Sequence, residues 1–301
     1  MKIKDYLIFF RVKNLLMIVI IQLLLKYVLF KKFDLTTSLD NFHFFILVLS
    51  TILITVAGYI INDINDIESD EINKPSKTFI NKKISIKKAD MLFLILNFIG
   101  LILGYYLSYS IDKISFFAIF IIASLLSYLY SIKLKKNILF KNLIVSFLAF
   151  LSIFIVGLYD IVPATNNFNN QGQLYVFNLI LKISIFSFLL TLLREMVKDL
   201  VDIKGDKKAN TKTIPIVIGI NKTKVLLILI GIFTVIAIIY FSISIFITYP
   251  LATYYLIIFI SLPLLYFVLK INYSNTKKSF SNLSNLLKIT MLLGILIVFL
   301  F

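Results

Sequence analysis

The sequence predicts an all-α, polytopic membrane protein with nine transmembrane helices. Three observations support this prediction. The 301 residues are 60% hydrophobic, whereas a soluble domain is nearer half apolar, and the mean hydropathy is +0.97. The third is the charge, because 31 Lys and Arg oppose 15 Asp and Glu, which gives a formal net charge of +16. A soluble nucleic-acid-binding protein would explain this charge but not the apolarity, and the many Ile, Leu and Phe exclude a disordered chain.

The rare residue types exclude several kinds of site. The chain contains no Cys and only one His. Disulfide scaffolds, cysteine-based zinc sites and thiol nucleophiles are therefore excluded, and so are metal sites built from several histidines. Any metal chemistry must rely on oxygen ligands.

Nine segments have the roughly 20 apolar residues that a membrane-spanning helix needs. Long apolar runs without period-2 alternation favour helices over a β-barrel. The segments lie near residues 15–30, 42–62, 91–110, 114–130, 139–158, 174–193, 225–247, 251–270 and 284–301. Lys26 interrupts the first segment, and we expect it to snorkel to the membrane interface. A signal peptide is disfavoured there, because no small-residue cleavage site follows and further spans do.

The distribution of basic residues predicts the orientation. The N-terminus and the loops after the second, fourth, sixth and eighth spans hold 25 of the 31 Lys and Arg. The positive-inside rule therefore places the N-terminus in the cytoplasm and the C-terminus outside. We expect one domain over residues 1–301, with cytoplasmic cap loops at about 62–90 and 194–224, in the cytoplasmic membrane of a prokaryote.

Nine of the 15 acidic residues lie in two clusters at the starts of these two cap loops. Both clusters contain the pattern D-x-x-D-x-x-x-D. Its members are Asp63, Asp66 and Asp70 in the first cluster, and Asp199, Asp202 and Asp206 in the second. The spacing i, i+3, i+7 places three carboxylates on one helical face. We therefore expect each triplet to continue a transmembrane helix at its cytoplasmic end.

Three like charges on one face repel one another, so a cation must offset them. Carboxylates without His or Cys nearby favour Mg²⁺ or Mn²⁺, and Mg²⁺ typically fills the rest of its shell with phosphate oxygens. Two such clusters facing each other can hold a diphosphate between metal ions. Lys side chains that can neutralise the remaining phosphate oxygens follow both clusters: Lys74, Lys77, Lys82, Lys83, Lys204, Lys207, Lys208 and Lys212. The alternative is a solvated charged loop, and the repetition of the same spacing argues against it.

These residues resemble the UbiA-type intramembrane prenyltransferases. Asn62 to Asp70 is similar to that family's N-D-x-x-D-x-x-x-D, and Asp199 to Asp206 is similar to its second Asp-rich motif. The resemblance implies a nine-helix fold and Mg²⁺-dependent transfer of an isoprenyl chain from an allylic diphosphate. It implies catalytic roles for all six aspartates of the two triplets. It further implies metal binding by Asp66, Asp70, Asp199, Asp202 and Asp206.

Shorter matches extend the resemblance to substrate-binding residues. Arg11-Val12-Lys13-Asn14 is similar to the family's R-P-x-N, and Tyr130-Ser131 resembles its Y-S-x-x-x-K, with Lys133 as an alternative to Lys135. Lys77 stands where the family has Arg, so it keeps the charge without the bidentate fork. The implied diphosphate- or acceptor-binding residues are Asn14, Asn62, Lys74, Lys77, Tyr130, Lys135, Asn142, Arg194 and Lys198.

Arginine is rare in this chain and marks the motif segments. Of the 31 basic residues, only Arg11 and Arg194 are arginines, and the rest are lysines. Because Lys serves elsewhere, an Arg indicates a site that needs a planar fork of donors. We hypothesise that Arg194 orients a motif carboxylate or the diphosphate. The alternative is a helix-end residue that snorkels to lipid headgroups.

The form R-E-x-x-K-D-x-x-D-x-x-G-D around the second motif resembles the branch that includes geranylgeranylglycerol-phosphate geranylgeranyltransferases. This implies geranylgeranylglyceryl phosphate as the acceptor, with aromatic, quinone-precursor or chlorophyll-type acceptors as the alternative. A cation-coupled secondary transporter is a second class, but transporters place charges near the bilayer midplane. Here the acids crowd one membrane surface. A structural or lipid-binding protein does not explain two matching triplets.

Overall fold

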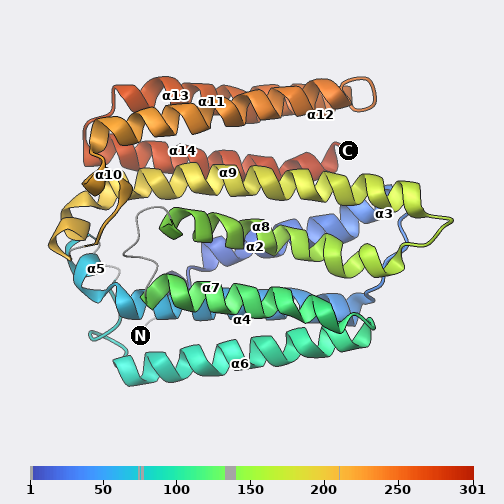
Figure 1. Cartoon of the computed structure of the whole chain (residues 1–301), viewed down its shortest axis with the longest axis horizontal. Coiled ribbons are helices and arrows are strands. Elements are labelled where there is room, and N and C mark those ends of the chain that lie inside the picture. The colour runs from blue at the N-terminus through green and yellow to red at the C-terminus, as the bar shows by residue number, and fades with distance from the viewer. Residues whose placement is uncertain (1–2, 74, 76–77, 133–139, 210) are drawn as a thin grey trace. The chain divides into compact units, whose positions relative to one another are not determined.

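The computed structural model describes residues 3–73, 75, 78–132, 140–209 and 211–301, and these residues confirm the predicted all-α class (Figure 1). Within them, nine helical stretches are long and apolar enough to cross a membrane, as predicted. Their bounds are Val12–Lys32, Asn41–Asn65, Ile86–Ser110, Ile114–Ser131, Lys141–Ala164, Asn170–Lys208, Ile220–Ile245, Pro250–Asn272 and Lys277–Phe299.

The chain forms two compact units. The first comprises residues 1–135 and 151–181, and the second comprises residues 136–150 and 182–301. Helices of the first unit are α1 (Ile3–Phe9), α2 (Val12–Leu24), α3 (Phe30–Lys32), α4 (Asn41–Asn65), α5 (Ile67–Asn73), α6 (Ile86–Ser110) and α7 (Ala118–Ile132). Helices of the second are α10 (Ile214–Val217), α11 (Ile220–Ile245), α12 (Pro250–Tyr255), α13 (Leu262–Asn272) and α14 (Lys277–Leu296). The chain passes from one unit to the other within α8 (Phe140–Asp160) and α9 (Asn170–Lys208).

In the first unit, α4 packs against α6 and α7 (Figure 1). Two glycines of α6 permit close packing, Gly100 against α4 and Gly104 against α7. A Cβ at Gly104 would lie 2.5 Å from the ring of Phe120, and one at Gly100 would lie 2.8 Å from the side chain of Ile54. The Gly100 carbonyl also accepts a hydrogen bond of 2.6 Å from Ser50 Oγ. Small residues and interhelical hydrogen bonds of this kind hold membrane helices together.

A hydrophobic cluster lies beneath the first acidic motif. It joins the end of α1 to the second half of α4 and the start of α6, and its members include Phe9, Ile60, Phe79 and Ala89. Lys83 adds an ion pair of 2.8 Å to Asp5 at the edge of this region. These contacts fix the end of α4 relative to the N-terminal helix, and thereby position the motif.

Lys26 does not snorkel to the interface, so that expectation is wrong. Its side chain is only 7% exposed and forms an ion pair of 2.8 Å with Asp160, which is completely buried. The ammonium also donates to the Leu39 carbonyl at 2.6 Å, and Asp160 accepts from the Leu39 N–H at 2.9 Å. An interior partner therefore balances the charge, as membrane-buried ionic groups require.

Candidate active site

The first motif spans a helix boundary. The helix α4 ends at Asn65, Asp66 is its C-cap residue, and Asp70 lies in α5. The amide of Asn65 donates to the Ile61 carbonyl at 2.9 Å and helps to end the helix. The expectation that one helix carries the whole first triplet is therefore wrong, although the Asp70 N–H still donates to the Asp66 carbonyl at 2.8 Å.

Arg11 holds the first carboxylate of this motif. It lies between α1 and α2 with φ 51° and ψ 43°, a left-handed conformation that costs a non-glycine residue about 1–3 kcal/mol. Its guanidinium pairs with Asp63 and lies 4.6 Å from the centroid of the Tyr59 ring. A strained backbone that brings a cation onto a motif carboxylate is typical of a functional site.

Burial lowers the pKa of Arg11, but the charge of Asp63 opposes this effect, followed by contributions from Tyr59, Asp70 and Tyr130. The net effect raises the pKa of Arg11 above its ordinary value, so the guanidinium stays charged. The structure therefore brings three predicted site residues, Asp63, Asp70 and Tyr130, into the electrostatic surroundings of Arg11. Tyr59 is a member of this group that the motifs do not reveal.

The second motif lies on a single helix, as predicted. All three of its aspartates belong to the last turns of α9. Asp199 and Asp206 are buried, whereas Asp202 is partly buried. Buried carboxylates need compensating charge or hydrogen bonds, so their surroundings indicate what each can bind.

Two donors from the start of α8 hold Asp199. Lys141 Nζ donates to Asp199 Oδ1 at 2.7 Å, and Asn142 Nδ2 donates to Asp199 Oδ2 at 2.8 Å. Asn142 was predicted from the sequence as a substrate-binding residue, whereas Lys141 was not predicted at all. A metal ion can reach Asp199 only if it displaces one of these donors or shares the carboxylate with it.

Just before Asp199 on α9, the charged side chains of Arg194, Glu195 and Lys198 form a group of their own. Lys198 Nζ donates to Glu195 Oε1, and Arg194 Nη1 lies 3.5 Å from the same oxygen. Among the described residues, the buried Nε of Arg194 has no hydrogen-bond partner. The guanidinium of Arg194 thus lies beside Glu195, and its proposed role in orienting a motif carboxylate or the diphosphate stays a hypothesis.

In both units, a basic side chain pairs with the first aspartate of the acidic motif. Asp63 pairs with Arg11, and Asp199 pairs with Lys141. In each case the cation precedes the motif in the chain and lies near the start of a helix. The first carboxylate of each triplet therefore has a basic partner within its own unit.

The remaining predicted residues have less defined surroundings. Asn14 lies in the first turn of α2, where its N–H donates to the Arg11 carbonyl at 2.7 Å. The buried Oδ1 of Asn62 has no hydrogen-bond partner in the part of the chain that the structure describes. Lys74, Lys77 and Lys135, like the alternative Lys133, lie outside the described residues.

The donor set fits a hard cation. Among the described residues, no group of three or more His, Cys, Asp or Glu side chains is gathered closely enough to hold a metal ion. Mg²⁺ does not need such a group, since it binds one or two carboxylates and takes other ligands from phosphates and water. Asp66 and Asp70 in one unit, and Asp202 and Asp206 in the other, are oxygen ligands of the required type.

Comparison with known proteins identifies the family. The model of the UbiA prenyltransferase family matches residues 33–292. The chain therefore belongs to the UbiA prenyltransferase family, and with nine apolar helices in its described residues it is an integral, multi-pass membrane protein. The predicted family resemblance is confirmed.

The curated relatives that are similar to this chain include digeranylgeranylglyceryl phosphate synthases. The digeranylgeranylglyceryl phosphate synthase of Sulfurisphaera tokodaii is 37% identical over 180 residues, which cover 59% of each chain. The synthase of the same name from Methanosphaera stadtmanae is 32% identical over 198 residues, 65% of each chain. The matched segments thus span about three fifths of the length of these curated relatives.

Solved structures agree with the fold. A digeranylgeranylglyceryl phosphate synthase is similar with a TM-score of 0.67 and 26% identity, over 99% of this chain and 97% of that one. A UbiA homologue from Archaeoglobus fulgidus, bound to GPP and Mg²⁺, has a TM-score of 0.57 and 16% identity, over 98% of this chain and 99% of that one. The second likeness supports the fold only.

Proposed function

We propose that this protein transfers a geranylgeranyl group from its allylic diphosphate to geranylgeranylglyceryl phosphate, at the cytoplasmic face of the membrane. The paired D-x-x-D-x-x-x-D motifs are the main support for this proposal. In both, the first aspartate is already compensated by Arg11 or Lys141. The names of the relatives support the acceptor, and the A. fulgidus homologue shows that a protein of this fold binds an allylic diphosphate with Mg²⁺.

Each group of residues has a distinct task in this proposal. Asp66, Asp70, Asp202 and Asp206 hold the metal ions, and Asp199 joins them where Lys141 releases or shares it. Bound Mg²⁺ would stabilise the charge on the departing diphosphate. The carbon–oxygen bond to the diphosphate breaks, a hydroxyl oxygen of the acceptor bonds to the allylic carbon, and the hydroxyl proton is released.

Basic residues complete the binding of the diphosphate in this proposal. Lys74, Lys77 and Lys135 carry charge that can neutralise phosphate oxygens left uncovered by metal. Tyr130, Asn14 and Asn62 are the candidates for contacts with the acceptor or with the diphosphate. The apolar helices surround the isoprenoid chain and keep water away, because water would otherwise compete as the nucleophile.

The test supplies purified protein with radiolabelled geranylgeranyl diphosphate, Mg²⁺ and a panel of acceptors. We expect labelled product with geranylgeranylglyceryl phosphate and none in EDTA. Asp66→Ala and Asp202→Ala proteins should fold but lose transfer, by a factor of about 100 or more if each removes a metal ligand. Glu71→Ala is the control, because this exposed carboxylate neighbours the first triplet without belonging to it.

The possible results separate the alternatives. Full activity in EDTA would overturn the metal-dependent mechanism. Labelled product only with an aromatic acceptor would keep the reaction class and change the substrate. Uptake of substrate into vesicles without any product would instead support a transporter.

A further inference from the structure

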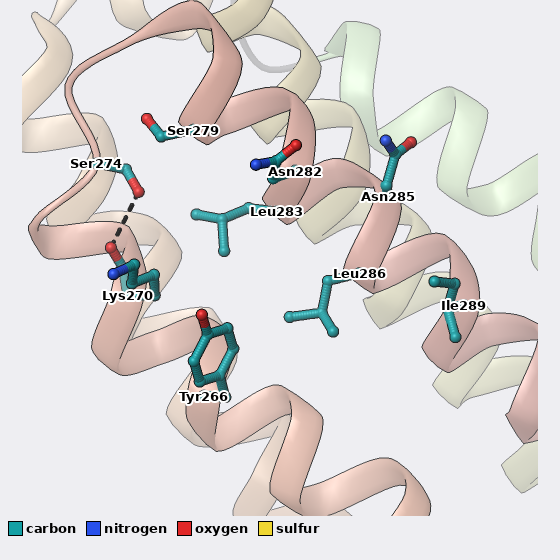
Figure 2. Close-up of a pocket in the computed structure, with 9 residues that line it drawn as sticks. All are labelled: Tyr266, Lys270, Ser274, Ser279, Asn282, Leu283, Asn285, Leu286 and Ile289. Atoms are coloured by element: carbon teal, nitrogen blue, oxygen red, sulfur yellow. Dashed lines mark hydrogen bonds between the residues drawn. The ribbon is translucent and has the colours of Figure 1, made fainter.

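A groove lined by both polar and apolar side chains lies between α13 and α14. Its volume is about 400 Å³. Figure 2 shows Tyr266 and Lys270 on α13 and Ser274 just after it, opposite residues of α14. The α14 side of the groove carries Ser279, Asn282, Leu283, Asn285, Leu286 and Ile289. All of these residues belong to the second unit.

The lining changes from polar to apolar along α14. The polar members run from Ser279 to Asn285, and Leu286 and Ile289 follow them. At 1.5 Å per residue, the polar stretch covers roughly 9 Å of helix. The headgroup region of one leaflet is about 5–8 Å thick. The groove is therefore mostly apolar, and its polar side chains Ser279, Asn282 and Asn285, with Leu283 among them, lie within a length comparable to a lipid headgroup.

The polar end of the groove lies at the end of the unit where α11 begins. Lys224 at the start of α11 donates to the carbonyl of Asn272 and to Oδ1 of Asn275 at 3.2 and 2.7 Å, and these residues join α13 to α14. The helix α11 follows the second acidic motif after only a short connection. The groove thus opens at a helix end, where a membrane surface lies, and not at the bilayer midplane.

The net positive charge of residues 209–301 favours an anionic partner. Residues 209–301 contain seven Lys and no Asp or Glu. Lys270 is exposed in the groove, and within the described residues it forms no ion pair. Asn282 and Asn285 are exposed beside it, and amides are costly to leave in hydrocarbon without hydrogen-bond partners. Ser274 is already satisfied, because its Oγ donates to the Lys270 carbonyl at 3.0 Å.

We propose that this groove binds one anionic phospholipid of the surrounding bilayer. The ammonium of Lys270 meets the lipid phosphate, and the exposed amides of Asn282 and Asn285 donate hydrogen bonds to the headgroup. The first carbons of an acyl or isoprenoid chain lie on Tyr266, Leu286 and Ile289. The proposal stands apart from the transfer reaction, because none of these residues belongs to the candidate active site.

Native mass spectrometry of the detergent-purified, full-length protein tests this proposal. Phosphatidylglycerol and phosphatidylcholine are added at equal concentrations, and bound lipid is counted. One lysine near a membrane surface contributes about 1 kcal/mol to anionic-lipid binding, a factor of about five. Lys270→Gln should therefore weaken phosphatidylglycerol binding about fivefold. The matched control is Lys278→Gln, which removes an exposed charge from the start of α14 outside the groove.

A second variant tests the apolar part of the groove. Ile289 is 54% exposed, so Ile289→Trp should fold and fill the space of the lipid chain, which lowers bound phosphatidylglycerol. Equal binding of the two lipids by the native protein, or equal losses in Lys270→Gln and Lys278→Gln, would overturn the proposal. Displacement by excess glycerol 3-phosphate would also overturn it, since that result indicates a site for a soluble anion.

Discussion

At the scale of single residues, charge compensation explains how two acidic clusters coexist in an apolar protein. Asp199 is 3% exposed at its side chain and has Lys141 and Asn142 as donors. A buried charge that loses its partner typically destabilises a protein by about 3–5 kcal/mol. Lys141 is therefore as much a part of the candidate site as the aspartate that it neutralises.

We predict that Lys141→Met lowers the free energy of unfolding by about 3 kcal/mol, because it leaves Asp199 without a counter-ion. Lys141→Arg should keep most of the stability, and adding Asp199→Asn to Lys141→Met should recover part of it. Chemical unfolding in detergent measures all three. Lys207→Met on the exposed end of α9 is the control, and a Lys141→Met protein as stable as this control would contradict the prediction.

The motifs predict some members of the site but not others. Asp63 was found because its motif has a fixed spacing, and Asn142 was found through the family resemblance. Lys141 and Tyr59 were missed because their contacts join residues far apart in the chain. Lys141 lies 58 positions from Asp199, and no spacing rule relates them. Composition did single out Arg11, since a rare Arg in a lysine-rich chain indicates a need for its planar fork.

At the scale of the helices, hydropathy predicts the spans well and their ends poorly. All nine predicted spans correspond to helices. The last segment was expected from residue 284, yet the helix begins at Lys277. Its first turns are polar, and a capping box formed by Thr276 and Ser279 starts it. The boundary between α4 and α5 at Asp66 was also missed. The i, i+3, i+7 spacing of the aspartates is the same whether one helix or two carry them.

The start of α4 gives a pH-dependent prediction. Asp40 accepts hydrogen bonds from the backbone N–H and the ring of His43, and these bonds lower the pKa of Asp40. A lowered pKa in the folded state means that the stabilisation is present above the unfolded pKa, near 3.9. It is lost as the pH falls through the lower folded value.

We therefore expect Asp40→Ala to have a lower thermal midpoint than the native protein at pH 7, because the N-cap of α4 is lost. The difference between the two midpoints should begin to shrink below about pH 4, where Asp40 of the unfolded chain becomes protonated, and should be lost once the pH falls below the lower pKa of the folded state. Asp40→Asn should behave like the native protein at pH 7, since Asn caps helices about as well. A difference that is unchanged at low pH would show that the cap does not depend on the charge.

At the scale of the whole molecule, the orientation in the membrane is a prediction that the chain makes easy to test. It has no Cys, so single cysteines can be introduced without altering a native one. Lys82 is 45% exposed in the first cap loop, and Phe168 is fully exposed between α8 and α9. A membrane-impermeant thiol reagent should label Phe168→Cys from outside the cell and Lys82→Cys only after the membrane is opened. The opposite pattern would invert the predicted topology.

The buried pair of Lys26 and Asp160 supplies a prediction about stability. Either Lys26→Met or Asp160→Asn should destabilise the protein by about 3–5 kcal/mol, because each leaves the other charge unpaired. The double variant should lose much less than the sum of the two, and thermal unfolding in detergent can measure this coupling. Additive losses would show that the two side chains act independently. Hydropathy did not reveal this pair, because it scores each span separately.

That pair also has a consequence for the synthesis of the protein. Asp160 follows Lys26 by 134 positions, which corresponds to about 7–27 s at 5–20 residues per second. Throughout that interval the lysine lacks Asp160 as a counter-ion, and a lysine within an isolated spanning helix opposes insertion by up to about 3 kcal/mol. The helix that carries Lys26 can therefore complete its burial only after most of its unit has been synthesised.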